Sequence, residues 1–218
     1  FVHPGQRQGQ GERERLGTLF VFGELRGAAA VARDLSRCFP VFRRNLAAIV
    51  SRVGRSEGTA NTVGEHTTAL PSQDRLAGLC VQVALARTLA AMGVPVLRVA
   101  GYGFGEAAAA CVSGALTLDV AAALVLAESA SELQDALEMA QIREGISWYS
   151  ATLARHTSSD DLHNSDFWHV VFEEDDDAVG TLMSETGSVM HVIVGAIATK
   201  VSLSIETPHI HFIDTVDQ

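Results

Sequence analysis

The sequence predicts a three-layer α/β/α fold, in which a mostly parallel sheet lies between helices on both faces. Short segments rich in β-branched residues, such as residues 94–100, alternate with longer apolar segments of helical character, such as residues 76–92. The composition, 47% hydrophobic and 19% charged, is typical of a globular chain, and 218 residues suffice for one sizeable core.

The amino-terminal part divides into an arm and the start of the domain. Residues 1–17 are rich in Gly, Gln and charge and are expected to form a linker or arm. The domain is therefore predicted to span residues 18–218, with Thr18–Phe22 as its first strand.

Two long helical regions follow. Residues 27–53 are predicted to be helical with a break at Phe39, because Pro40 disfavours helix at the residue before it. Residues 76–92 are predicted to form an apolar helix that ends at Gly93.

The centre of the sequence is a glycine-rich turn. Residues 94–100 are predicted to form a buried strand, Gly101, Gly103 and Gly105 a tight turn, and Glu106 the start of an Ala-rich helix. Strand, sharp turn and helix are the layout of a nucleophile elbow, whose G-x-S-x-G motif exposes a serine. Here Gly103 stands at the serine position, so the pattern predicts an active-site frame without its nucleophile.

The carboxyl-terminal part is predicted to complete the sheet. A short helix is expected over residues 131–142. Residues 189–194 are interpreted as the last strand of the sheet, with residues 201–205 as a possible further strand.

The stretch around the turn resembles a known enzyme family. GYGFGEAAAACVSGALTLDVAAALV, from Gly101 on, is similar to the GHSxGE-xAA-x-GALSLEDA stretch of malonyl- and acyl-CoA:acyl-carrier-protein acyltransferases, above all the acyltransferase domains of modular polyketide synthases. Tyr102 takes the place of the family's histidine, Gly103 of its serine, and Phe104 stands between Gly103 and Gly105. The resemblance implies an α/β-hydrolase-like core. DAVGTLMSETG, at residues 177–187, resembles a further helix of the family, and the resemblance implies a helix there.

The family's first-strand motif has two possible copies. FVHPGQ at residues 1–6 and LFVFGELRG at residues 19–27 both resemble it. The second copy lies at nearly the family's distance from FPVFRRNL, a segment that resembles the family's helix start, and so supports a first strand at Thr18–Phe22. The first copy stays open as the alternative.

Several positions depart from the family pattern. Gly23, Glu24 and Leu25 replace the loop that contributes backbone N–H groups to the family's oxyanion hole, and an acid beside a developing oxyanion opposes its stabilisation. Arg75 replaces a glutamine that orients substrate, and Glu128 falls where the family has the arginine that pairs with the malonyl carboxylate. The resemblance therefore implies that this route of malonyl recognition is lost.

The chain also lacks room for part of the family's fold. Between Glu128 and Ile142 the family has a ferredoxin-like subdomain and the motif of its catalytic histidine, and here only a short helix is predicted. The serine, its base and the lid over the cleft are thus expected to be missing together. The chain begins at Phe1, which suggests a piece of a larger protein.

Charge is distributed unevenly. Residues 1–100 carry 13 Lys and Arg against 7 Asp and Glu, whereas residues 101–218 carry 3 against 19. Arg33, Arg37, Arg43 and Arg44 lie along the predicted helices and have two interpretations. They form either a solvated helix face or a docking surface for an acidic carrier protein or a neighbouring domain. Nucleic acid is not expected as a partner, because the whole chain is acidic.

No cofactor or metal is expected. Cys38, Cys80 and Cys111 are widely spaced, which favours a reduced, cytoplasmic setting over disulfides. His209 and His211 alternate but match no zinc template, and the acidic residues 173–177 lack the spacing of a calcium loop. No apolar segment is long enough to span a membrane, and the first residues do not resemble a signal peptide.

Three functional hypotheses follow. The first is a non-catalytic acyltransferase-like domain of a polyketide synthase, retained for structure or for docking a ketosynthase, an acyl carrier protein or a trans-acting acyltransferase. The second is an acyltransferase that loads acyl groups from CoA onto a carrier protein with groups supplied by a partner or by Ser113, Cys111 or Tyr102. The third is nucleotide binding, although G-x-G-x-G is not the dinucleotide fingerprint.

Overall fold

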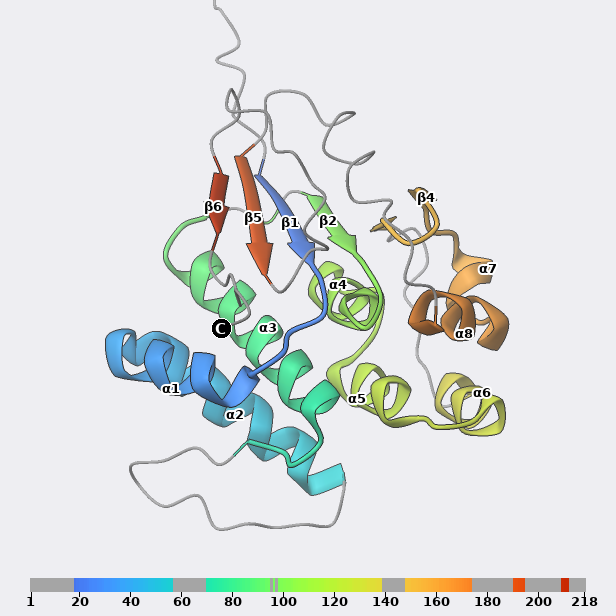
Figure 1. The fold of residues 1–218 in the computed structure, drawn as a ribbon, viewed down its shortest axis with the longest axis horizontal. Coiled ribbons are helices and arrows are strands. Elements are labelled where there is room, and N and C mark those ends of the chain that lie inside the picture. The colour runs from blue at the N-terminus through green and yellow to red at the C-terminus, as the bar shows by residue number, and fades with distance from the viewer. Residues whose placement is uncertain are drawn as a thin grey trace, which may run out of the picture.

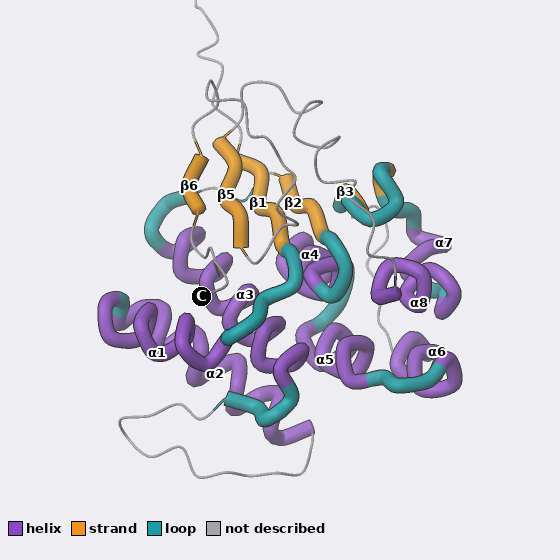
Figure 2. Tube along the Cα trace, in the orientation of Figure 1, coloured by secondary structure: helices purple, strands orange, loops and turns teal. Residues whose placement is uncertain are grey.

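The computed structural model describes residues 18–56, 70–94, 96, 98–138, 148–173, 190–194 and 209–211. These residues form a mixed α/β fold in which helices gather around a six-stranded sheet (Figures 1 and 2). The predicted α/β class with a mostly parallel sheet is confirmed. The elements, in chain order, are β1 (Thr18–Phe22), α1 (Ala28–Cys38), α2 (Pro40–Ser56), α3 (Asp74–Ala91), β2 (Arg98–Gly101), α4 (Gly105–Ser113), α5 (Leu118–Leu126), α6 (Ala130–Glu138), β3 (Tyr149–Ser150), β4 (Arg155–His156), α7 (Ser159–Leu162), α8 (Ser165–Glu173), β5 (Met190–Val194) and β6 (His209–His211).

The strand order in the sheet is β4-β3-β2-β1-β5-β6. All neighbouring pairs are parallel except β3 and β4, which form an antiparallel edge. β1 lies between β2 and β5, and all five of its residues are buried, as the apolar sequence LFVF requires. Thr18–Phe22 is thus a strand, as predicted, and the alternative motif copy at residues 1–6 lies outside the described residues.

β2 begins at Arg98, four residues later than the predicted strand at residues 94–100. The Val94 N–H donates to the Leu89 carbonyl at 3.0 Å, so this residue still caps the preceding helix. Pro95 has no N–H to offer a sheet ladder. The helix prediction itself is confirmed, since α3 ends at Ala91 and Gly93 follows with a φ of +89°.

The predicted break in the first helical region is also confirmed. Phe39 separates α1 from α2 with φ −127° and ψ 97°, an extended conformation that a following proline favours. Figure 1 shows the two helices at one end of the molecule, where α2 packs against α3.

Buried side chains join the helices to the sheet. α4 contacts β1 and β2 directly, and α3 and α5 pack against α4. Trp148 and Trp168, both nearly inaccessible to solvent, fill the space at the other end of the core, where α6 packs on α8. In the part of the chain that the structure describes, no helix is long and apolar enough to span a membrane.

The end of the sheet differs from the prediction. β5 pairs with β1, but β6 pairs with β5 on its outer side, so residues 189–194 do not supply the last strand. The sequence of β6, His-Ile-His, has only one apolar residue and so gives no strand signal. The strand is recognised by its pairing with β5. Helix α6 spans Ala130–Glu138, within which the predicted helix at 131–142 is confirmed, and residues 139–142 lie outside the described residues. The predicted arm at residues 1–17, helix at 177–187 and strand at 201–205 lie outside the described residues.

Candidate active-site region

The glycine turn lies at the carboxyl ends of β1 and β2. The Tyr102 N–H donates to the Phe22 carbonyl at the end of β1 (2.9 Å), and the Ala151 N–H donates to the Gly101 carbonyl (2.7 Å). The Gly103 N–H donates to Thr152 Oγ1 at 3.1 Å. The turn is therefore held by β1 on one side and by the segment after β3 on the other, and α4 starts two residues beyond its tip.

Two glycines of the turn have opposite surroundings. Gly103 has a φ of +53°, and a Cβ built on it meets no atom within 4 Å. A Cβ on Gly105 would overlap the Phe22 carbonyl oxygen, at 2.1 Å. The base of the elbow is thus packed tightly against β1, whereas its tip faces open space, as a position that presents a side chain must.

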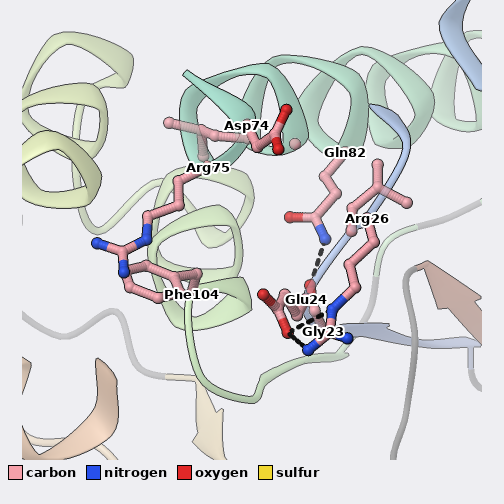
Figure 3. A pocket seen from close by; sticks show the side chains of 10 residues that line it. Gly23, Glu24, Arg26, Asp74, Arg75, Gln82 and Phe104 are labelled. Carbon is pink, nitrogen blue, oxygen red and sulfur yellow. Dashed lines mark hydrogen bonds and ion pairs between the residues drawn. The ribbon is translucent and has the colours of Figure 1, made fainter. Parts of the chain in front are cut away.

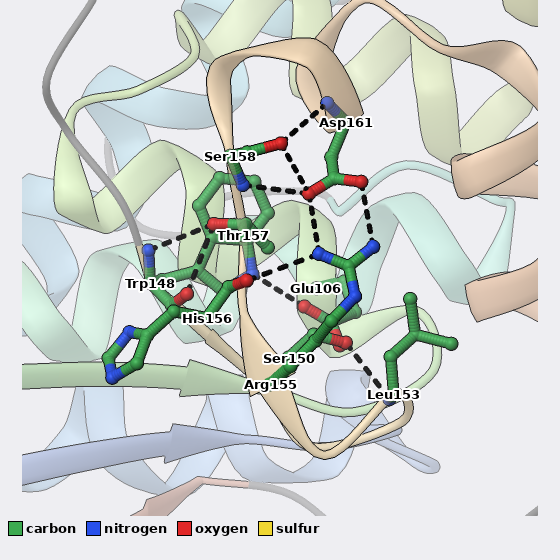
Figure 4. A network of polar contacts seen from close by, with 9 residues as sticks. All are labelled: Glu106, Trp148, Ser150, Leu153, Arg155, His156, Thr157, Ser158 and Asp161. Carbon is green, nitrogen blue, oxygen red and sulfur yellow. Dashed lines mark hydrogen bonds and ion pairs between the residues drawn. The ribbon is translucent and has the colours of Figure 1, made fainter.

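Beneath the turn, Glu106 is fully buried at the start of α4. Trp148 Nε1 and Ser150 Oγ donate to its two carboxylate oxygens at 2.5 and 2.6 Å (Figure 4). Burial raises the pKa of Glu106 to about 8, although the hydrogen bonds from Ser150, Trp148 and Thr152 act in the opposite direction. Glu106 therefore joins α4 to β3 and keeps its proton at neutral pH.

A second polar group in Figure 4 fixes the antiparallel edge. Arg155 of β4 donates to both carboxylate oxygens of Asp161 at 2.7 Å, and Asp161 also forms a capping box with Ser158 at the start of α7. The Arg155 guanidinium holds the pKa of Asp161 well below its usual range. Thr157 adds hydrogen bonds to the N–H and carbonyl of Trp148, so β3, β4 and α7 are tied together.

Next to the elbow is an open cavity of about 330 Å³ at the carboxyl end of β1 (Figure 3). It lies between the loops that follow the parallel neighbours β1 and β2, outside the carboxyl ends of these strands, which is the side of an open α/β sheet where ligands bind. The residues that line it come from the loop after β1, from α3 and from the elbow. They are Gly23, Glu24, Leu25, Arg26, Asp74, Arg75, Gly78, Leu79, Gln82 and Phe104.

The structure brings several of the predicted site residues together here. Gly23, Glu24 and Leu25 form one wall, and Phe104 of the elbow belongs to the other. The Gln82 side chain donates to the Gly23 carbonyl at 2.5 Å, and Glu24 pairs with Arg26 at 3.2 Å.

Glu128 lies elsewhere. It is exposed and precedes α6, where its N–H donates to Glu132 Oε2 at 2.7 Å, and it is not among the residues that line the cavity. The loop between α5 and α6 thus presents it to solvent.

None of the substitute nucleophiles considered from the sequence is among the described residues that line the cavity. The Ser113 hydroxyl donates to the Ala110 carbonyl at the end of α4. Burial raises the pKa of the Cys111 thiol to about 11, which keeps it protonated and unreactive. Tyr102 is buried beneath the turn. Among the described residues, those that line the cavity include no serine, cysteine or histidine.

The predicted arginine surface consists of Arg33 and Arg37 on α1 and Arg43 and Arg44 on α2. All four are exposed, and Arg37 lies 3.9 Å from Asp34. His209 and His211 lie on β6. Within the described ranges, no group of three or more His, Cys, Asp or Glu side chains is placed to hold a metal ion.

Sequence reasoning missed two features of this region. The partners of Glu106, Trp148 and Ser150, lie more than forty residues away along the chain. The sequence held no signal for these partners, because an acid in the first turn of a helix is favoured by the helix dipole whether or not it has a distant partner. Nor did it hold a signal for the contact of Arg75 with Phe104, in which the guanidinium carbon lies 4.0 Å from the ring centroid.

No family model and no curated protein sequence matches the chain. Solved structures do match. The acyltransferase domain of SpnD, in complex with 2-(pent-4-yn-1-yl)malonyl, has a TM-score of 0.61 at 13% identity over 82% of this chain, which spans 65% of that domain. The acyltransferase domain from the second module of the salinomycin polyketide synthase has a TM-score of 0.65 at 16% identity, covering 88% of this chain and 68% of that one.

A third match is MCAT from Streptococcus pneumoniae, with a TM-score of 0.62 at 14% identity over 88% of this chain and 95% of that one. Identities this low report on architecture and not on activity. With the elbow, the cavity and the parallel sheet in place, the conclusion is that this chain has the fold of polyketide synthase acyltransferase domains.

Proposed function

We propose that this chain is a non-catalytic acyltransferase-like domain of a polyketide synthase-type assembly, with a structural or docking role. One observation carries the proposal: the tip of the elbow is Gly103, which has no side chain. Acyl transfer through a covalent intermediate needs a nucleophile held by a base, and a glycine supplies neither.

The surroundings of Gly103 support the same proposal. The cavity beside the elbow is lined by charged and apolar side chains, and the described lining offers no group that could replace a serine and its histidine. Glu24 stands in the loop that would have to stabilise an oxyanion. Residues 127–148 leave room for α6 but not for a ferredoxin-like subdomain, which has four strands and two helices. We infer that the domain lacks this subdomain as well as the nucleophile and its base.

The proposed docking surface is formed by Arg33, Arg37, Arg43 and Arg44. These side chains extend from α1 and α2 into solvent, and α1 and α2 pack side by side. The only acid paired with them among the described residues is Asp34, at a distance typical of a weak surface contact. Positive charge of this kind steers an acidic partner, and we propose an acyl carrier protein, a ketosynthase or a trans-acting acyltransferase in that role.

A second function remains a candidate because the tip of the elbow is open. With no atom within 4 Å of the Gly103 Cβ position, a partner could introduce a catalytic side chain there without collision. In this alternative the chain is an acyltransferase that transfers acyl groups from CoA to a carrier protein with borrowed groups.

Radiolabelled malonyl-CoA and acetyl-CoA distinguish the two functions. After incubation and acid precipitation we expect no label on this chain, with or without an acyl carrier protein, whereas an intact acyltransferase domain serves as the positive control. Stoichiometric label on this chain refutes the non-catalytic proposal. Label on the carrier protein that depends on this chain favours the second function.

A further inference from the structure

The cavity beside the elbow carries its charges on two separate walls. In Figure 3, Glu24 and Arg26 lie together on one wall, and Arg75 lies against Phe104 on the other. Both nitrogen atoms of Arg26 that face Glu24 donate to the same carboxylate oxygen, at 3.3 and 3.2 Å. The charge of Arg26 is therefore already balanced, and Arg75 is the cation that a ligand would meet.

Arg75 is oriented by an aromatic ring. Its guanidinium carbon lies 4.0 Å from the centroid of Phe104. The Phe104 ring in turn stacks on Phe172 of α8, with centroids 4.7 Å apart and an interplanar angle of 20°. A guanidinium stacked on a ring by its face keeps the N–H groups along its edge free for hydrogen bonds in the plane.

In the part of the chain that the structure describes, no carboxylate forms an ion pair with Arg75, although the acidic residue Asp74 precedes it in the first turn of α3. The planar fork of an arginine matches the two oxygens of a carboxylate, and such a pair is among the stronger hydrogen-bonded contacts in proteins.

The other lining residues limit the ligand further. With Glu24 paired to Arg26, Asp74 is the acid of the lining that adds negative charge beside Arg75, so a dianion such as phosphate meets more repulsion than a single carboxylate does. Leu25 and Leu79 supply apolar surface, and about 330 Å³ holds only a small molecule.

From these observations we propose that the cavity binds a short-chain monocarboxylate reversibly, with Arg75 on the carboxylate and Leu25 and Leu79 against the aliphatic part. No covalent step is involved, since the elbow presents only Gly103. The proposal goes beyond the docking role and does not depend on it, because the arginine surface lies on α1 and α2 and the cavity on α3 and the elbow.

The test is an NMR titration of the full chain with hexanoate, with its neutral analogue hexanamide, and with inorganic phosphate. We expect saturable binding of hexanoate that weakens at least about tenfold in Arg75→Met, which corresponds to about 1.4 kcal/mol. Arg44→Met, which removes an exposed arginine from α2, is the matched control and is expected to bind hexanoate like the wild type. The hexanoate affinity of Arg75→Lys is expected to lie between those of Arg75→Met and the wild type, because lysine keeps the charge but lacks the planar fork.

Thermal unfolding of each variant checks that the substitutions leave the fold intact, as expected for an exposed side chain. Absence of saturation with hexanoate in the millimolar range overturns the proposal. The proposal is also overturned if hexanamide binds as tightly as hexanoate or if phosphate binds more tightly than hexanoate. An Arg75→Met variant that binds hexanoate as tightly as the wild type overturns it as well. None of these outcomes bears on the acyl-labelling result, so the two proposals fail separately.

Discussion

Gly103 and Gly105 stand two positions apart in the elbow, yet the chain needs glycine at them for different reasons. At Gly105 the neighbouring β1 leaves no space, because a Cβ would lie 2.1 Å from the Phe22 carbonyl oxygen. At Gly103 the space is open, and only the backbone, with a φ of +53°, favours glycine. A side chain at Gly103 therefore costs conformational energy but meets no steric obstacle.

This difference predicts the outcome of restoring the serine. We expect Gly103→Ser to fold, at a cost of roughly 1–2 kcal/mol for the left-handed backbone, and to show no transferase activity. Activity is measured by transfer from malonyl-CoA to a carrier protein, and stability by thermal unfolding. Gly105→Ser is the matched comparison and is expected to be insoluble or destabilised by several kcal/mol, about 3 or more. Measurable turnover by Gly103→Ser would show that a base is present after all.

Glu106 makes stability depend on pH in a direction opposite to that of most carboxylates. Its pKa in the folded protein is about 8, above the ordinary value of 4.5, because burial disfavours the charged form. The unfolded chain releases this proton from about pH 4.5 upward, whereas the folded protein retains it until about pH 8. The stabilisation from Glu106 is therefore complete below the unfolded pKa and is lost as the pH rises through the folded pKa.

We expect the free energy of unfolding to fall between about pH 5 and pH 8, with a slope from this one group of no more than about 1.4 kcal/mol per pH unit. In Glu106→Gln this component should disappear, because an amide does not titrate. Urea unfolding at several pH values measures the free energy of unfolding of the wild type and of Glu106→Gln. Asp135→Asn, which removes an exposed carboxylate from α6, is expected to keep the wild-type slope, and a Glu106→Gln profile parallel to the wild type would contradict the assignment.

Among the elements, the β3–β4 hairpin holds the elbow on the side opposite β1. Its strands are only two residues long, so backbone pairing alone holds it weakly. The side chains of Ser150 and Thr152 and the backbone N–H of Ala151 reach the elbow and Glu106. The turn between the strands includes Ala154, the one described residue other than glycine with a positive φ, at 50°.

Replacing Ala154 by glycine should therefore stabilise the protein. A left-handed conformation costs an L-residue roughly 1–2 kcal/mol, and glycine removes this cost but loses some unfolded-state entropy, so a net gain of up to about 1 kcal/mol is expected. Thermal unfolding measures the gain. The same substitution at exposed Ala48 within α2 is the control, where glycine is expected to destabilise by about 1 kcal/mol. A lower midpoint for Ala154→Gly would count against backbone strain at this turn.

At the scale of the whole molecule, the excess of basic residues and the elbow lie in different halves of the sequence. The basic half of the sequence forms β1 and helices α1 to α3, whereas the acidic half supplies the elbow and everything after it. The arginine surface on α1 and α2 is therefore not neutralised by its own sequence neighbours, apart from Asp34. Association through such a surface is steered by long-range attraction, which salt screens over about 10 Å at 0.1 M.

The docking proposal predicts a salt-dependent effect of charge reversal. The double variant Arg43→Glu and Arg44→Glu is expected to bind an acyl carrier protein from a polyketide synthase module at least about tenfold more weakly at low salt, and the loss should shrink at high salt. Surface plasmon resonance at two ionic strengths measures it. Arg98→Glu, an exposed arginine at the start of β2, is the control. Equal binding by the double variant and the wild type at both ionic strengths would remove the support for docking at this surface.

The local features of this protein could be predicted from its sequence alone. Glycine at position 103, the turn and helix around it and the break at Phe39 are properties of neighbouring residues, and each lies in the structure where it was predicted, although the strand before the turn starts later. Propensity and periodicity describe local geometry and burial, and these suffice for such features.

What surrounds the elbow depends on tertiary contacts. The partners of Glu106 are Ser150 of β3 and Trp148 just before it, the cavity is bounded by the loop after β1 and by α3, and Phe104 contacts Arg75 of α3. The late start of β2 and the pairing of β6 were likewise set by a capped helix and by a neighbouring strand. These contacts join segments far apart in the chain, and a local pattern of residues holds no information about which distant segments the packed core brings together.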